Sequence, residues 1–340
     1  MSSPRRRWFT AIAISVALTA SLTACSSGSG AAVGDNGLPI VRFSALPDPA
    51  PLPVLVMQEN GIDEKYGFDA EFLEVDPDVA TTTFLMGESD IAIDQDAVGS
   101  AIANNEGHSV VSFYPALSNT ASIVTRPDTG IDTPADLVGK RVGHFGMDSG
   151  TTQAIGVSLK EGFGIDITSF ELVQSSPASL PELLASGEVD AIFDYEPYSS
   201  KAIESTGGKY VFQVTPYWNE AANWSPPLAM LTARAEWLSN NGELAQNVLK
   251  AWQEAEKIIA DSGYQLFLQE PYAGFLDRDS VEELQTLATY CAQLPCYPGT
   301  WTQADVDEQM KYLQLLVDAG MLAEIPDTAP VATLDSLVTQ

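Results

Sequence analysis

The chain has few basic residues and very little histidine. Its 340 residues include 16 lysines and arginines against 46 acids, which gives a formal charge of −30, and two histidines. Nucleic-acid binding needs basic patches that replace counterions, so this composition argues against a nucleic-acid partner. A charge of this size favours solubility through self-repulsion and says nothing about the fold.

Cysteine is also scarce, with three in the chain. Two of them, Cys291 and Cys296, lie in the stretch CAQLPC, where Pro295 bends the backbone. In an exported protein such a pair predicts a disulfide, although two buried thiols or half of a metal site are alternatives. A metal site would need further ligands nearby, and His108 and His144 are both distant in sequence. We therefore predict no metal.

Common catalytic motifs are missing as well. The sequence has no G-x-S-x-G elbow, no H-E-x-x-H helix and no phosphate-binding loop. We therefore expect a protein that is not an enzyme and that has no cofactor. An enzyme acting in a cleft remains an alternative, because Asp94 and Asp194 could form a carboxylate pair like that of glycoside hydrolases.

The N-terminal apolar run, from Trp8 to Ala20, is shorter than the ~20 residues of a membrane-spanning helix. Three arginines precede it, and small residues and a Ser/Gly-rich stretch follow, which predicts a secretory signal. Residues 22–25, Leu-Thr-Ala-Cys, resemble the lipobox of bacterial lipoproteins, which are cleaved before the cysteine and acylated on it. An ordinary secreted chain with a stray Cys25 is the alternative.

The resemblance to lipoproteins implies an extracytoplasmic chain that is anchored to the cell membrane by lipid. Residues 1–24 would be the signal peptide, Cys25 the acylated residue, and 25–37 a flexible tether. Two or three acyl chains anchor stably, at ~0.8 kcal/mol per buried methylene. Removal of the signal, which contains three arginines and no acid, takes the formal charge to about −33.

Short strands alternate with helices along residues 38–121, and the same rhythm restarts after residue 126. This alternation predicts α/β lobes with largely parallel sheets. From Leu228 onward the apolar spacing, for instance Leu244, Val248 and Trp252, predicts helices that pack back on the first lobe. We therefore expect residues 122–221 to form a second lobe inserted in the first, which comprises 38–121 plus 222–340.

Three stretches together resemble a known family. They are GESDIAIDQDAVGSAIANNEG, TGIDTPADLVGKRVGHFGMDSGTT and ELLASGEVDAIFDYEPYSSKAIE, within a match over roughly 40–235. They resemble the sulfonate-, nitrate- and thiamine-precursor-binding branch of the solute-binding proteins of ABC importers. The resemblance implies a type II periplasmic-binding-protein-like fold and a monomer that closes on a small ligand and docks on a membrane permease.

Ligands of open parallel sheets bind beyond the carboxyl ends of the strands, so the cleft between the lobes is the expected site. The family pattern, carried over position by position, identifies candidate ligand-binding residues in the loops there. These are Ser44, Asp94, Gln95, Tyr114, Asn119, Ser149, Thr151, Thr152, Asp194, Tyr195 and Trp224.

The charges in these loops indicate which ligands the cleft prefers. The helix start at 149–152 could bind an anion, or it could be a plain cap. The loops carry several acids and no lysine or arginine. Each acid changes the energy of a unit charge ~4 Å away by about 4 kcal/mol at an effective dielectric near 20. We therefore expect a neutral heteroaromatic or amine-bearing ligand, with aliphatic sulfonate, taurine or nitrate as the alternative; any single acid could also be a solvated loop tip.

Overall fold

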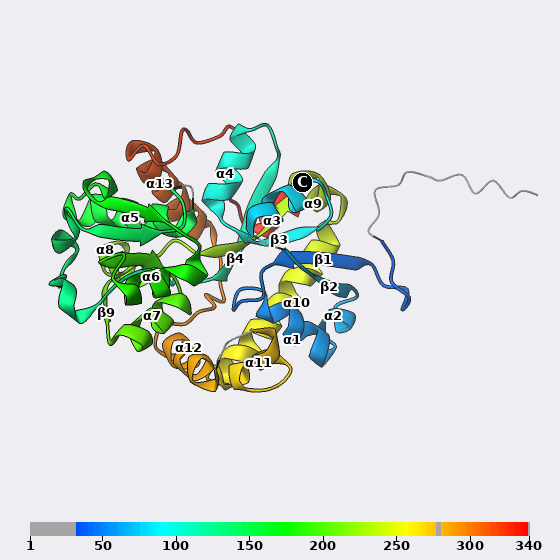
Figure 1. Cartoon of the computed structure of the whole chain (residues 1–340). Coiled ribbons are helices and arrows are strands. Elements are labelled where there is room, and N and C mark those ends of the chain that lie inside the picture. Colours follow the sequence, from blue (N-terminus) through cyan, green and yellow to red (C-terminus); the bar gives the residue numbers. More distant parts are fainter. Residues whose placement is uncertain (1–31, 76, 148, 277–279, 339–340) are drawn as a thin grey trace, which may run out of the picture. The chain divides into compact units, whose positions relative to one another are not determined.

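The computed structural model describes residues 32–75, 77–147, 149–276 and 280–338, which belong to one compact unit. Two five-stranded sheets and the helices around them confirm the predicted α/β class (Figure 1). The predicted signal peptide, Cys25 and the first part of the predicted tether lie outside the described residues.

The first sheet has the strand order β2-β1-β3-β10-β4. Strand β1 pairs in parallel with β2 and β3, and β10 pairs antiparallel with β3 and β4. All four parallel strands therefore end at the same edge, which we call the first carboxyl edge. The strands are β1 Ile40–Ala45, β2 Asp69–Glu74, β3 Ile91–Gln95, β4 Val110–Leu117 and β10 Ala229–Arg234.

The second sheet has the order β7-β6-β8-β5-β9. Strand β6 pairs in parallel with β7 and β8, and β5 pairs antiparallel with β8 and β9. The ends of β6, β7, β8 and β9 define the second carboxyl edge. The strands are β5 Ser122–Thr125, β6 Arg141–His144, β7 Glu171–Gln174, β8 Ala191–Asp194 and β9 Lys209–Gln213.

Helices connect and cover the strands. Those in the N-terminal half are α1 Leu52–Asn60, α2 Ile62–Lys65, α3 Pro77–Leu85, α4 Ala97–Asn105 and α5 Gly150–Phe163. Those that follow are α6 Leu180–Ser186, α7 Tyr198–Thr206, α8 Val214–Ala222, α9 Ala235–Asn240 and α10 Gly242–Asp261. The last are α11 Tyr272–Phe275, α12 Val281–Gln293, α13 Gln303–Asp318 and α14 Leu334–Val338, and short 3-10 turns link several of them.

The two antiparallel strands, β5 and β10, are absent from the sequence-based prediction. Each follows one of the two crossovers between the sheets, and each lies inside its sheet rather than at an edge. All four residues of β5 are buried, and so are the first five of β10. Neither strand therefore shows the alternation of buried and exposed positions that identifies a half-exposed strand. Strand β10 lies at the beginning of the part from Leu228 onward, which is mostly helical, as predicted.

Two large hydrophobic cores lie around the sheets, and the second also contains Ala97, Val98 and Ala101 of α4 and Met230 of β10. The first core joins β1, β3 and β4 to helices α1, α10 and α12, with Trp252 at its centre. The second core joins β5, β6 and β8 to α5 and α8, and it also includes Val306, Tyr312, Leu313 and Leu316 of α13. Helix α13 therefore packs with the second core, and with α4, whereas α10 and α14 pack together on the first.

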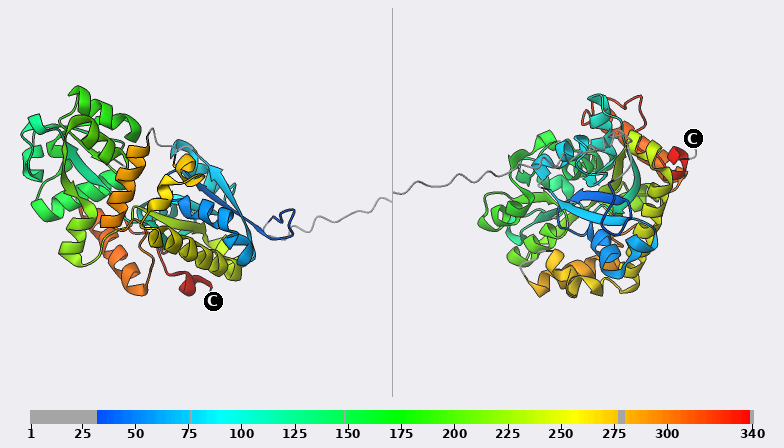
Figure 2. Two further views of the ribbon diagram at one scale, coloured as in Figure 1. Left: turned by 90° about the horizontal axis from the view of Figure 1, so that it is seen from below. Right: turned by 90° about the vertical axis from the view of Figure 1, so that its right-hand side faces the viewer.

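Helix α12 lies between the helices around the first sheet and those around the second. Its buried face belongs to the first core, and it lies beside α7 of the second sheet (Figures 1 and 2). The hydroxyl of Thr286 on α12 donates to Glu204 on α7 at 2.6 Å. Cys291 near the end of α12 and Cys296 just after it are joined in the structure, with Cα atoms 5.0 Å apart.

Candidate functional site

Acidic residues follow strands at both carboxyl edges. Asp48 lies in the loop after β1, and Asp94 and Asp96 lie at and just after the end of β3. Asp194 is the last residue of β8, and Glu196 follows it. Because parallel strands end at one edge, each sheet gathers its acids there.

Asp94 lies at the first carboxyl edge. Its Oδ2 accepts a hydrogen bond of 2.7 Å from the backbone N–H of Leu46. Solvent reaches the residue, yet protein surrounds it on most sides. Burial, and then the charge of Asp48, raise the pKa of the Asp94 carboxyl well above its usual value. A positive group nearby would therefore favour the ionised form of Asp94.

Asp194 is fully buried at the second carboxyl edge, and its hydrogen bonds are incomplete. Its Oδ1 accepts from the backbone N–H of Tyr195 at 3.0 Å. No described residue donates to its Oδ2, which is buried. Burial raises the pKa of this carboxyl well above its usual value, and the charge of Glu196 adds to the rise. An unsatisfied buried acceptor costs ~1–3 kcal/mol, so a donor that reached Oδ2 would stabilise the site.

Tyr195 connects the acids of the two edges. Burial raises the pKa of its phenol well above the usual value, and four neighbouring groups add to this rise. They are, in order of effect, Tyr198, Asp48, Asp194 and Asp94. Asp48 and Asp94 belong to the first sheet and the others to the second, so acids of both sheets act on one phenol. The Tyr195 ring also meets Phe145 and Tyr198 edge to face, with centroids 5.6 and 5.4 Å away.

Asp96 makes a second connection between the sheets. Its Oδ1 caps α4 by accepting from the N–H of Gly99 at 2.7 Å. Its Oδ2 lies against Gly150, the first residue of α5, so close that a Cβ atom there would be 2.8 Å away. Burial raises the pKa of Asp96 to about 6, which leaves the carboxyl largely ionised at neutral pH. Helices α4 and α5 therefore begin at the same carboxylate.

The other polar residues predicted near these acids are engaged within the protein. The hydroxyl of Ser44 is buried against that of Ser89, 2.8 Å away, and Gln95 donates to Thr81 at 2.7 Å. Ser149 caps α5, as its Oγ accepts from the N–H of Thr152 at 3.2 Å. Thr151 and Thr152 are buried in the first turn of that helix.

Three predicted ligand residues lie elsewhere. Tyr114 is buried in the first core, where its hydroxyl donates to Glu256 at 2.8 Å. Asn119 caps the turn before β5, and Trp224 packs on Tyr312 with centroids 6.3 Å apart. Both line a cavity of about 340 Å³ between the two crossovers and the segment that links α12 to α13. The structure thus brings Asp94, Asp194 and Tyr195 together and leaves these three apart.

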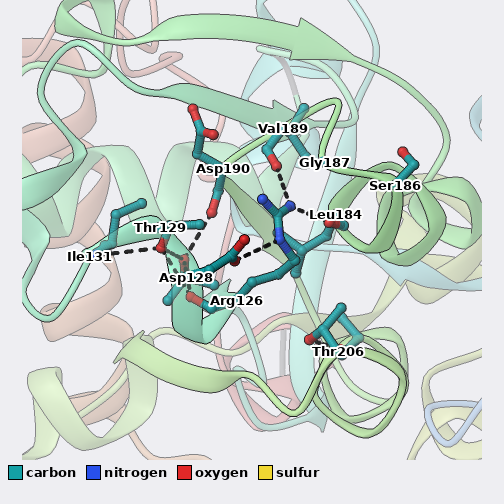
Figure 3. Close-up of polar contacts among 12 residues, drawn as sticks. Arg126, Asp128, Thr129, Ile131, Leu184, Ser186, Gly187, Val189, Asp190 and Thr206 are labelled. Atoms are coloured by element: carbon teal, nitrogen blue, oxygen red, sulfur yellow. Dashed lines mark hydrogen bonds and ion pairs between the residues drawn. The ribbon is translucent and has the colours of Figure 1, made fainter.

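Basic side chains of the second sheet gather at the edge opposite Asp194. Arg126 follows β5 and donates to backbone carbonyls near the end of α6, including that of Val189 at 2.9 Å (Figure 3). Arg141 begins β6 and pairs with Asp190 at 3.0 Å. Because β5 runs antiparallel to β8, the end of β5 and the beginnings of β6 and β8 share this edge. These cations are thus a strand's length away from the second carboxyl edge.

Asp48, Asp96 and Tyr198 are absent from the list of predicted ligand residues. Asp48 lies one position beyond the loop that the family pattern suggested, and Tyr198 belongs to the Glu-Pro-Tyr step that the pattern contains. Asp96 is one of the acids that the sequence analysis placed in the loops of the expected cleft, without assigning it to the ligand.

Within the described part of the chain, no cluster of three or more His, Cys, Asp or Glu side chains could hold a metal ion. Over the same ranges, no helix combines the length and the apolar character needed to cross a membrane.

A family model described as NMT1/THI5 like matches residues 48–262. This range contains Asp48, Asp94, Asp96, Asp194 and Tyr195. No curated protein matches the chain significantly.

Solved structures share the fold at low sequence identity. The periplasmic aliphatic sulphonate binding protein SsuA from Escherichia coli has a TM-score of 0.68 and 17% identity, over 88% of this chain and 99% of that one. The periplasmic nitrate-binding protein NrtA from Synechocystis PCC 6803 has 0.64 and 14%, over 85% and 84%. The desulfurization enzyme DSZB has 0.60 and 16%, over 88% and 98%. Binding proteins and an enzyme thus share this fold, and the fold by itself does not determine the function.

Proposed function

Because the chain belongs to the NMT1/THI5-like family, we propose that it is the extracytoplasmic substrate-binding protein of an ABC importer. In this role it binds a small molecule between its two sheets and delivers it to a membrane permease. The fold that it shares with SsuA and NrtA supports this role. The two sheets, each with its own set of parallel strands, support a pair of lobes that close on the ligand.

The proposal includes export and anchoring. Residues 1–24 are cleaved as a signal peptide, Cys25 is acylated, and residues 25–37 tether a monomeric body to the membrane. Residues 38–121 plus 222–340 form one lobe, and residues 122–221 form the other. Cys291 and Cys296 form a disulfide outside the cell, where thiols are readily oxidised.

The main support for the ligand assignment is that Asp194 has a buried oxygen without a donor among the described residues. In addition, acids of both sheets raise the pKa of the nearby Tyr195. An ammonium or a ring N–H would supply that donor and stabilise the ionised carboxyl. At ~4 Å, each ionised acid would favour such a cation by about 4 kcal/mol at an effective dielectric near 20. The ligand is therefore an amine or a neutral heteroaromatic compound that can stack on Tyr195, for instance an aminopyrimidine.

A second candidate is a sulfonate or nitrate ligand. The start of α5 favours it, because a capped helix N-terminus with two buried threonines presents N–H groups to an anion. The names of SsuA and NrtA point the same way. The acids around Tyr195 disfavour it.

An enzyme is the candidate from another class. The likeness to DSZB and the two carboxyls with raised pKa values, Asp94 and the buried Asp194, favour it. Such a protein would convert the compound that it binds.

A thermal-shift screen of the mature chain tests these candidates. It compares an aminopyrimidine, riboflavin and simple amines with taurine, alkanesulfonates and nitrate. A bound ligand stabilises the folded state by about 2.7 kcal/mol at a hundred times its Kd. We expect stabilisation by an amine or heteroaromatic compound, which is recovered unchanged after incubation.

Stabilisation by sulfonate or nitrate alone would contradict the proposed ligand class and leave the binding role standing. Recovery of a product would instead establish an enzyme. Absence of any shift with every compound, in a folded chain, would argue against the ligand classes tested.

A further inference from the structure

Asp96 holds a position that no other described acid shares, between the first turns of two helices. Its Oδ1 is 2.7 Å from the N–H of Gly99 in α4. Its Oδ2 and Cγ lie 2.8 and 3.6 Å from the place that a Cβ atom on Gly150 would take, at the start of α5. A glycine at this point of α5 lets the carboxylate approach the helix backbone.

The start of α5 is where an anion would bind. The first N–H groups of a helix have no acceptor within the helix, and the helix dipole adds positive potential there. The Ser149 hydroxyl accepts from only one of them, the N–H of Thr152. Asp96 thus brings a negative charge to this helix end from the loop after β3.

The third side of Asp96 is closed by an aromatic group. Tyr312 of α13 is buried, and burial together with the charge of Asp96 raises the pKa of its phenol. Its ring packs edge to face on Trp218, with centroids 5.7 Å apart. Asp96 therefore caps α4, lies against the first residue of α5 and affects the pKa of this phenol.

We propose that Asp96 determines the charge preference of the binding site, because its carboxylate lies beside the start of α5, where an anionic ligand would bind. A sulfonate or nitrate that approached this helix end would meet a fixed negative charge, whereas a neutral or cationic ligand would not. This inference rests on the proposed function and assigns a specificity-determining residue to the same site.

The test uses methanesulfonate as an anionic probe and dimethyl sulfone as a neutral probe of similar shape. Binding of each is measured by calorimetry at constant ionic strength, on the mature chain and on Asp96→Asn. Asparagine is a good N-cap, so the variant keeps an acceptor for the N–H of Gly99 and loses the charge. We expect methanesulfonate to bind Asp96→Asn at least about tenfold more tightly than the wild type, with little change for dimethyl sulfone.

Two further variants make the result decisive. Asp96→Ser also keeps a cap but withdraws from Gly150, so it should gain affinity for methanesulfonate as well. Asp166→Asn is the matched control, because Asp166 is an exposed N-cap whose Oδ1 accepts from Thr168 at 2.9 Å. It loses the same charge just beyond the C-terminal end of α5, at the opposite end of the helix from Gly150, and should behave like the wild type.

Equal affinity of the wild type and both Asp96 variants for methanesulfonate, whether weak or strong, would overturn the inference. An equal gain in Asp166→Asn would also overturn it, because net charge would then be responsible. A wild type that binds methanesulfonate tightly could still serve an importer, so the proposed function would survive that result. Conversely, a gain in the Asp96 variants stands even if no amine is found to bind.

Discussion

Glu256 differs from the acids at the carboxyl edges because both of its oxygens have donors. The Tyr114 hydroxyl and the Trp252 indole N–H each donate to it at 2.8 Å. Burial nevertheless raises the pKa of this carboxyl from 4.5 to about 8. Glu256 therefore holds a proton in the folded core at neutral pH. Its effect on the free energy of unfolding can be measured without a ligand.

The folded chain keeps this proton between pH 4.5 and about 8, where the unfolded chain has released it. Glu256 should therefore lower the free energy of unfolding by about 1.4 kcal/mol per pH unit as the pH rises through that window. Glu256→Gln mimics the protonated acid, since its amide can donate to Tyr114 and its oxygen can accept from Trp252. We expect urea unfolding to show a variant about as stable as the wild type near pH 5 and more stable at pH 8.

The neighbouring Glu254 is the control. It pairs with Lys65 at 2.6 Å, and this hydrogen bond lowers its pKa. Its contribution is therefore present above the usual pKa and is lost as the pH falls, so Glu254→Gln should not gain stability at pH 8. The same gain in both variants would show that removal of any acid is stabilising and would contradict the argument for Glu256.

Asp94 is expected to act on the ligand rather than on folding. Asp94→Asn keeps an acceptor for the N–H of Leu46 and removes the charge. For an amine ligand we expect weaker binding by about 1–3 kcal/mol, which a thermal-shift titration would measure. Asp90→Asn is the matched control, because Asp90 precedes the same strand at its other end and its Oδ2 accepts from the backbone N–H of Arg42 at 2.9 Å. An unchanged affinity in Asp94→Asn would identify Asp94 as a solvated loop residue.

At the scale of elements, helices α4 and α5 belong to different sheets and yet start at one carboxylate. The contact depends on Gly150, because any side chain there meets Asp96. Helix propensity alone would favour alanine over glycine by about 1 kcal/mol. Packing therefore predicts that Gly150→Ala destabilises the protein, whereas helix propensity predicts that it stabilises it.

We expect packing to dominate, so that Gly150→Ala lowers the free energy of unfolding by about 1–2 kcal/mol. In an Asp96→Ser background the shorter side chain leaves room, and the same alanine should cost little or stabilise. A double-mutant cycle measured by chemical denaturation gives the coupling. Additive effects of the two substitutions would mean that the contact contributes nothing to stability.

At the scale of the whole molecule, the two sheets are connected by more than the two crossovers. Helix α13 follows α12 in sequence, but it packs with the second core, and the chain then returns to the first sheet, where Val331 pairs with Ser112. Along this return, Gln153 and Lys160 of α5 donate to the carbonyls of Met321 and Ala319, each at 3.3 Å. Any closing motion between the sheets must therefore move α13 and this segment together with α5.

The proposed anchor also acts on the whole molecule. Cys25→Ser should prevent acylation and release the chain from the membrane fraction into the medium, since a body with a formal charge of about −33 has little affinity for an anionic surface. Fractionation followed by immunoblotting measures this. Cys291→Ser is the control and should stay with the membrane; if Cys25→Ser stays there too, the lipid anchor is wrong.

The sequence by itself determined the class of the fold, the positions of most parallel strands and the acidic character of both carboxyl edges. These features are local, because a strand or helix shows its buried face through its own period, and the acids follow the strands directly. Tertiary structure alone decided the placement of β5 and β10 and the burial of the Tyr114 side chain in the first core. It also decided the contact of Asp96 with Gly150. Strand β4 is buried at all eight positions, so no alternation could indicate where Tyr114 points. The contact between α4 and α5 joins loops of two sheets, and only their packing brings that carboxylate to the helix end.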